Sequence, residues 1–188
     1  MRESVPFGVL PSVLRPAFIA ASIAWAALLV IAPWFAAQAH AAPIEGAFLF
    51  AVYAIGGGIC HQRPERSFFL WAEQMPVCAR CAGIYFGAAI AAIIAMVMAA
   101  APLKGRPTTE GRLTTERRPT NAGAAAVARA ILIAAALPAV FSLLYEWTTG
   151  QMPSHWARAA TGLPIGAAVA WLVLAALHTE ARAADQVN

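Results

Sequence analysis

All three cysteines of the chain fall in one polar stretch, residues 60–81, which reads CHQRPERSFFLWAEQMPVCARC. Cys78 and Cys81 have the C-x-x-C spacing that lets two thiolates bind one metal ion, and an expected helix begins beside them, where backbone N–H groups lower a thiol pKa. Cys60 and His61 add a third thiolate and an imidazole. Three cysteines and one histidine form a tetrahedral ligand set suited to Zn²⁺. The stretch therefore predicts a metal site, with zinc as the best-fitting ion.

The fourth ligand has more than one candidate. Neighbouring cysteine and histidine side chains do not always reach the same ion, so Glu146 or His155 could replace His61. Glu146 ends an apolar run, where an ionisable group is costly and therefore a functional candidate. It could equally be an interfacial carboxylate that pairs with Arg158, and His155 could be an ordinary loop histidine. These alternatives stay open in the sequence.

Three arginines in or beside the cysteine stretch have a plausible electrostatic role. A zinc ion bound by three cysteines and one histidine leaves a net charge of about −1 on the site, which is unfavourable near lipid unless it is balanced. We expect Arg63, Arg66 and Arg80 to supply the balancing positive charge.

Other uses of the same cysteines compete with metal binding. Cys78 and Cys81 could form a redox pair in a membrane thiol-disulfide oxidoreductase, with Cys60 as a third, resolving thiol. The cysteines could also pack as small hydrophobic residues. Attachment of a c-type haem needs C-x-x-C-H, and position 82 is alanine. A metal enzyme would need a general base, for which Glu146 is the candidate, and an accessory role in metal or small-molecule transport is a further alternative.

The composition indicates an integral membrane protein. Of the 188 residues, 61% are hydrophobic and 12% are charged, against about a quarter charged in soluble domains. The net charge of +4 needs no nucleic acid, because basic residues beside spans are the usual cytoplasmic retention signal. Strand alternation and nucleotide-binding loops are not found. Long apolar runs predict an all-α, multi-pass protein of the cell membrane with four to five transmembrane helices, at residues 16–37, 44–59, 82–103, 124–144 and 161–177.

We divide the chain into three parts. Residues 1–43 form an N-terminal membrane anchor, for which a cleaved signal peptide is the alternative. Residues 44–178 form a membrane domain that contains the cysteine loop, 60–81, and a flexible basic loop, 104–123. Residues 179–188 form a polar tail. The fourth run is expected to be kinked or broken near Pro138.

The topology depends on residues 44–59. About 16 apolar residues ending in three glycines are marginal for a span and typical of a segment that enters the membrane and returns. The glycines lower helix propensity where the chain must turn into the polar loop. With this segment not crossing, the cysteine loop is outside and nine basic residues are cytoplasmic, as the positive-inside bias prefers: Arg2, Arg15, Lys104, Arg106, Arg112, Arg117, Arg118, Arg129 and Arg182. In either topology the cysteine loop and residues 145–162 share one membrane face.

Two G-x-x-x-G motifs predict close helix packing. GIYFG, with Gly83 and Gly87, and GLPIG, with Gly162 and Gly166, both stand at the start of a span that leaves the cysteine-bearing face. Small residues at this spacing let helix backbones approach closely. We therefore expect these two helices to pack together beneath the loop, and the same motifs could support self-association of chains.

The stretch CHQRPERSFFLWAEQMPVCARCAGIYFG resembles the hallmark of a family of small bacterial and archaeal membrane proteins, domain of unknown function 2085. A looser second patch resembles the family's later motif, where the family more often has Asp in place of Glu146. The resemblance implies a membrane location and no established activity. The matching residues are Cys60, His61, Pro64, Arg66, Ser67, Phe68, Pro76, Cys78, Arg80, Cys81, Gly83, Tyr85 and Gly87, then Pro138, Glu146, Gly150, Arg158, Thr161, Gly162 and Gly166.

Overall fold

Every predicted apolar run forms a helix in the computed structural model of the chain, which describes residues 9–38, 43–100 and 121–185. The helices are α1 (Val9–Ala37), α2 (Pro43–Ile59), α3 (Ala79–Ala100), α4 (Asn121–Thr149) and α5 (His155–Asp185). All of these except α2 are long and apolar enough to cross a membrane. The expected all-α, polytopic membrane fold is confirmed, with four candidate spans.

Several predicted boundaries differ from the structure. The helix α1 begins at Val9, so it contains Pro16 as well as Pro33. The helix α4 runs through Pro138 without a break, and α5 runs to Asp185, so much of the predicted tail is helical. Of the predicted basic loop, residues 104–120 lie outside the described part of the chain, and residues 121–123 belong to α4.

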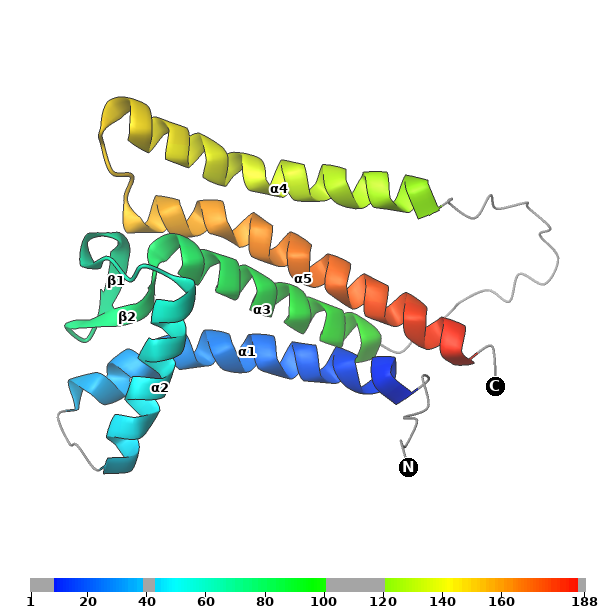
Figure 1. Cartoon of the computed structure of the whole chain (residues 1–188), viewed down its shortest axis with the longest axis horizontal. Coiled ribbons are helices and arrows are strands. Elements are labelled where there is room, and N and C mark those ends of the chain that lie inside the picture. Colours follow the sequence, from blue (N-terminus) through cyan, green and yellow to red (C-terminus); the bar gives the residue numbers. More distant parts are fainter. Residues whose placement is uncertain (1–8, 39–42, 101–120, 186–188) are drawn as a thin grey trace.

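The cysteine loop lies at one end of the helix bundle (Figure 1). In Figure 1, α1, α3, α4 and α5 run side by side, and α2 lies steeply across one end of them. The loop, the start of α3, the end of α4 and the start of α5 all gather at that end. The predicted neighbourhood of the cysteine loop and residues 145–162 is therefore confirmed.

The helix α2 ends at Ile59, the predicted end of this apolar segment. The three glycines before it, residues 56–58, belong to the helix. Gly56 is buried, and a Cβ atom there would collide with the backbone carbonyl of Pro76. At this position glycine allows the polar loop to pack directly against the helix.

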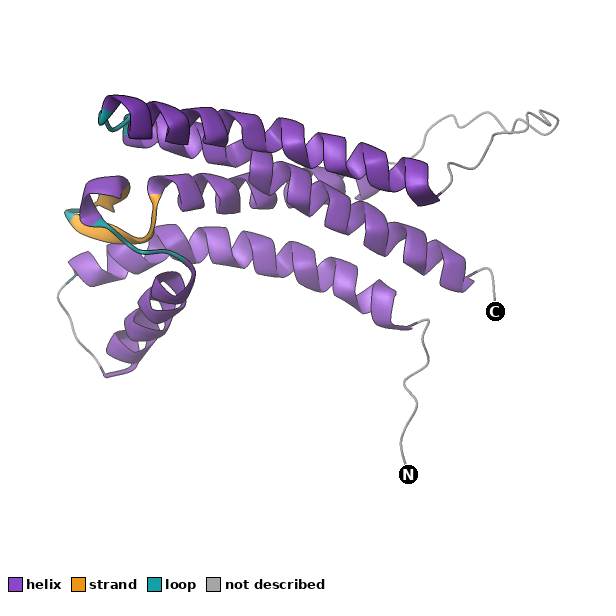
Figure 2. Cartoon of the chain, turned by 45° about the horizontal axis from the view of Figure 1, so that its top comes forward, coloured by secondary structure: helices purple, strands orange, loops and turns teal. Residues whose placement is uncertain are grey.

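The cysteine loop contains a short β-hairpin that the sequence pattern did not predict (Figure 2). After a single 3₁₀ turn (Pro64–Arg66), strand β1 (Ser67–Leu70) pairs antiparallel with β2 (Glu73–Cys78). The connecting residues, Trp71 and Ala72, have φ angles of 53° and 67°, the positive values that a two-residue type I′ turn requires. Polar and apolar residues do not alternate cleanly here, and the register is irregular between Ser67 and Phe69.

The predicted packing of the two glycine motifs is confirmed within the chain. The helix α3 packs most extensively against α5. A Cβ atom at any of the four glycines would collide with backbone of the facing helix: Gly83 with Ala159, Gly87 with Leu163, Gly162 with Arg80, and Gly166 with Ile84. The backbones are therefore in direct contact, and self-association through these motifs stays a prediction.

The orientation in the membrane is a prediction that two single-cysteine variants test. In a cysteine-free background, we expect a membrane-impermeant thiol reagent to label Gln151→Cys on intact cells, because Gln151 is exposed at the cysteine-loop end. Thr115→Cys, in the basic loop outside the described residues, should react only after permeabilisation, since positive charge is retained in the cytoplasm. The opposite labelling pattern would reverse the assigned orientation.

Candidate metal centre

Three different elements deliver the cysteines to one point. Cys60 follows the last residue of α2, Cys78 is the last residue of β2, and Cys81 lies in the first turn of α3. Their Sγ atoms all lie within 4.8 Å of one another, and all three thiols are free. The structure therefore brings together the three cysteines that the sequence predicted as ligands.

Two hydrogen bonds hold Cys60 in place, one through its backbone and one through its sulfur. The backbone N–H of Cys60 donates to the carbonyl of Gly56, 2.9 Å away, which continues the α2 pattern by one residue. The backbone N–H of Cys78 donates to Cys60 Sγ at 3.2 Å. This second bond joins the ends of α2 and β2 directly at the cluster.

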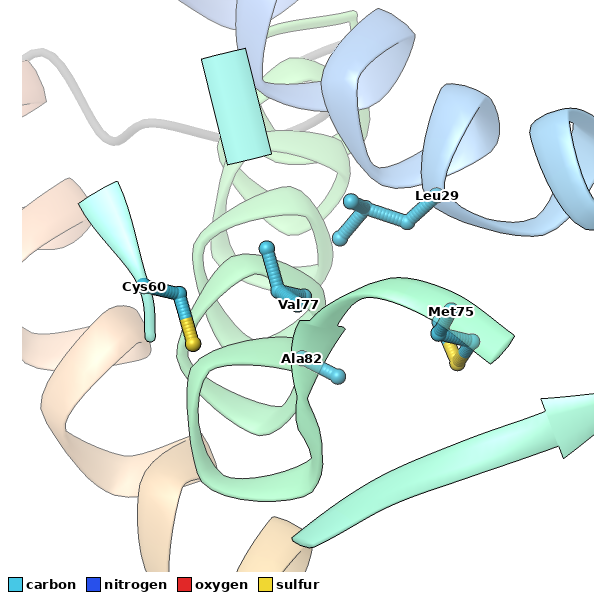
Figure 3. Close-up of a cluster of buried hydrophobic side chains, with 5 residues drawn as sticks. All are labelled: Leu29, Cys60, Met75, Val77 and Ala82. Atoms are coloured by element: carbon cyan, nitrogen blue, oxygen red, sulfur yellow. The ribbon is translucent and has the colours of Figure 1, made fainter. Parts of the chain in front are cut away.

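Apolar side chains pack behind the sulfurs. Cys60 is buried with Leu29, Met75, Val77 and Ala82 (Figure 3), and Cys78 and Cys81 pack against this group while remaining partly exposed. Because apolar packing covers one side of the cluster, a ligand can approach only from the other side.

A polar network that the sequence analysis missed holds the loop in place. Gln62 Nε2 donates to the carbonyls of Tyr53, at 2.8 Å, and Pro76, at 2.6 Å. Gln74 Nε2 donates to the carbonyl of Gln62 at 2.6 Å and to Ser67 Oγ at 3.2 Å. These amides join the hairpin to α2 and to the residues before the hairpin, and they supply donors to backbone carbonyls there. The only signal in the sequence was the presence of amide side chains near the cysteines.

The Cys78 thiol has a lowered pKa. This pKa falls to about 5, first because the Cys81 side chain donates a hydrogen bond to the Cys78 sulfur, while burial acts in the opposite direction. Backbone N–H groups of Cys81 and Arg80 at the start of α3 lower the pKa further. The lowered pKa favours the thiolate of Cys78, the form that binds metals and attacks disulfides.

His61 lies at the rim of the cluster. A cavity of about 360 Å³ opens beside the sulfurs, and its lining includes all three cysteines together with His61 and Arg66. The His61 side chain is exposed, and its ring nitrogens lie outside the group formed by the three sulfur atoms. The structure thus places His61 at the open side of the centre.

Glu146 lies in a cluster of arginines. Its Oε1 atom is 2.6 Å from Arg158 Nη2 and 3.1 Å from Arg66 Nη2, and its Oε2 atom is 3.8 Å from Arg80 Nη2. The Glu146 side chain is 7% exposed and that of Arg158 is 3% exposed. Arg80 also donates to Ser142 Oγ at 3.0 Å. The pairing with Arg158 that the sequence offered as an alternative is therefore present.

His155 lies apart from the sulfurs. It is the first residue of α5, and its Nε2 atom is 3.2 Å from the carbonyl oxygen of Glu65. Its ring packs against Phe68, with centroids 5.7 Å apart. In this position it attaches the start of α5 to the polar loop.

Comparisons with known proteins agree with this picture of the cysteine loop and the helices behind it. Residues 60–172 match the family model described as a predicted membrane protein (DUF2085). An uncharacterized protein of Methanocaldococcus jannaschii is 41% identical over 66 residues, which cover 35% of this chain and 42% of that protein.

A second uncharacterized protein, from Methanothermobacter thermautotrophicus, is 57% identical over 30 residues, which cover 16% of this chain and 27% of the relative. The chain therefore spans less than half the length of either relative. No solved structure matches it.

Proposed function

The chain belongs to the family of predicted membrane proteins DUF2085, and we propose that it binds one thiophilic metal ion, zinc before others, through Cys60, Cys78 and Cys81. The site lies at the end of the helix bundle where the polar loop and the start of α3 meet. We propose that the protein lies in the cell membrane, because its basic residues fit the positive-inside pattern of a multi-pass protein of that membrane.

The close approach of three thiols from separate elements carries this proposal. Zinc–thiolate bonds of about 2.3 Å in a tetrahedral site place ligand sulfurs about 3.8 Å apart. The sulfurs here lie within 4.8 Å of one another, so small side-chain rotations suffice to reach that spacing. The lowered pKa of Cys78 favours binding at neutral pH, because less free energy is needed to form the ligating thiolate.

A fourth ligand would reach the ion from the side of the cavity. The apolar packing around Cys60 closes the inner side, and Glu146 is held by its arginines. His61 lines the cavity and could swing towards the sulfurs, or a molecule from solution could complete the site. A centre with three protein ligands and an open position is typical of catalytic or transfer sites, whereas structural zinc sites are closed.

Metal analysis of the detergent-purified protein tests the proposal. We expect about one zinc ion per wild-type chain, and a cobalt-substituted protein should show the thiolate-to-metal charge-transfer absorption of a cysteine-rich site. Cys78→Ser with Cys81→Ser should lose nearly all the metal, because one remaining thiolate cannot hold the ion.

His155→Ala is the matched control, since His155 lies at the same membrane face but apart from the sulfurs. Its metal content should equal that of the wild type. Wild-type protein without metal, or a double cysteine variant that retains it, would contradict the proposal.

Thiol-disulfide exchange is the second candidate, and the low pKa of Cys78 favours it. In that reaction the Cys78 thiolate attacks the disulfide of a partner protein and releases one partner thiolate. Cys81 then attacks Cys78 and releases the other partner thiolate. The Cys78–Cys81 pair is oxidised to a disulfide while the partner gains two electrons.

Trapping of a mixed disulfide distinguishes thiol-disulfide exchange from metal binding. A variant with both Cys60→Ser and Cys81→Ser should accumulate a mixed disulfide through Cys78 if exchange is the function, because no neighbouring thiol is left to resolve it. Alkylation of freshly isolated membranes that finds all three thiols reduced and protected by metal, with no mixed disulfide in the variant, would exclude exchange.

A further inference from the structure

We propose that the cavity beside the sulfurs is a binding site for a small molecule with one anionic donor group, a carboxylate or a thiolate. The group would fill the open position of the metal and be held by the guanidinium of Arg66. This inference rests on the proposed metal binding, and it names the chemical class of ligand that the centre takes.

The charges around the centre favour an anion. Arg66, Arg80 and Arg158 surround the single carboxylate of Glu146, so this cluster keeps two positive charges. Three thiolates on a divalent ion carry one negative charge. One positive charge therefore remains uncompensated in a region that is partly or wholly buried, where an unbalanced charge is costly. Arg63 does not change the sum, because Glu65 pairs with it at 3.9 Å.

Arg66 is the arginine that reaches both the cluster and the cavity. Its Nη2 atom pairs with Glu146, yet its side chain is 36% exposed and lines the cavity beside Cys78 and Cys81. Its Nε atom is buried, and no described protein group accepts a hydrogen bond from it. A guanidinium offers five N–H donors, so binding Glu146 leaves others for a ligand. Glu146 thus orients Arg66 and does not fill the site itself.

The cavity suits a small molecule. Its volume of about 360 Å³ is near the lower end of ligand pockets, and its rim carries Gln62 and His61 as additional polar groups. A ligand there would contact the metal and Arg66 at once. A neutral ligand would bind the metal without an ionic contact to Arg66. We therefore expect the cavity to bind anions in preference to neutral ligands.

Visible spectroscopy of the cobalt-loaded full-length protein in detergent tests this assignment. Titration with acetate and with 2-mercaptoethanol should shift the cobalt d–d bands with saturation, and imidazole serves as the neutral ligand. In Arg66→Gln we expect the dissociation constant for acetate to rise about tenfold, because a charge-assisted hydrogen bond is lost. The value for imidazole and the cobalt content should stay unchanged.

Arg129→Gln is the control, since Arg129 is exposed on α4 and belongs to neither the cavity nor the arginine cluster. If wild-type protein binds no cobalt, the metal-binding function itself fails. If cobalt binds but neither anion changes the spectrum, only the anion site is overturned. Equal acetate affinity in wild type and Arg66→Gln would remove Arg66 from the site. Should Arg66→Gln not fold, wild-type protein that binds acetate no more tightly than aqueous cobalt does would overturn the assignment by itself.

Discussion

Replacing Glu146 by glutamine should destabilise the folded protein by about 3 kcal/mol or more, because removing one member of a buried ion pair leaves the other charge uncompensated. Arg158 is 3% exposed and would lose its closest acceptor, at 2.6 Å. Arg66 and Arg80 would lose the same counter-charge. Unfolding monitored by circular dichroism in mixed micelles with increasing denaturing detergent measures the change.

A double-mutant cycle tests the cause of this loss. Adding Arg158→Gln to Glu146→Gln should recover part of the stability, because the two residues are coupled through direct contact. Glu65→Gln is the matched control: its carboxylate pairs with Arg63 at 3.9 Å on the surface, so the change should stay within about 0.5 kcal/mol. Additive effects of the two cluster mutations would contradict the pairing.

The Glu146→Gln variant also distinguishes between two roles for Glu146. If Glu146 acts only through the arginines, a folded Glu146→Gln protein keeps its metal. If it is a ligand, as the sequence allowed, metal content falls with the fold intact. The structure, in which the carboxylate is shared among three guanidinium groups, favours the first outcome.

Replacing Gly166 by alanine should destabilise the protein by about 1–3 kcal/mol, the range of overpacked cores. The new Cβ atom would collide with the backbone carbonyl of Ile84, and backbone cannot move aside as a side chain can. The helices α3 and α5 must therefore separate, which should also disturb Cys81 in the first turn of α3. The free energy of unfolding and the metal content should fall together.

Gly46→Ala is the control, and its expected effect on stability has the opposite sign. Gly46 lies in α2, and a Cβ atom there meets nothing within 4 Å. Alanine has the higher helix propensity, so this variant should be more stable by up to about 1 kcal/mol. A stabilising effect at Gly166 as well would show that the close contact between α3 and α5 does not constrain the protein.

The existence of the helices and the packing of α3 on α5 could be predicted from local pattern. Apolar runs long enough to cross a membrane are enough to predict the helices. The two G-x-x-x-G motifs are enough to predict the packing, because both start from the same membrane face and so reach the same depth. The three cysteines could be grouped because they share one loop with no other thiols in the chain.

The sequence by itself thus determined a helical membrane protein with a cysteine cluster at one face. Only the tertiary structure decided which groups the remaining polar side chains contact. Glu146, His155 and His61 are all near the loop, but contacts between distant segments place the first among arginines, the second against Phe68 and the third at the cavity rim. The hairpin and its amide network likewise depend on packing against α2, where Gly56 meets the carbonyl of Pro76. Such choices follow from which partner satisfies each buried polar group, and that information is not local in the chain.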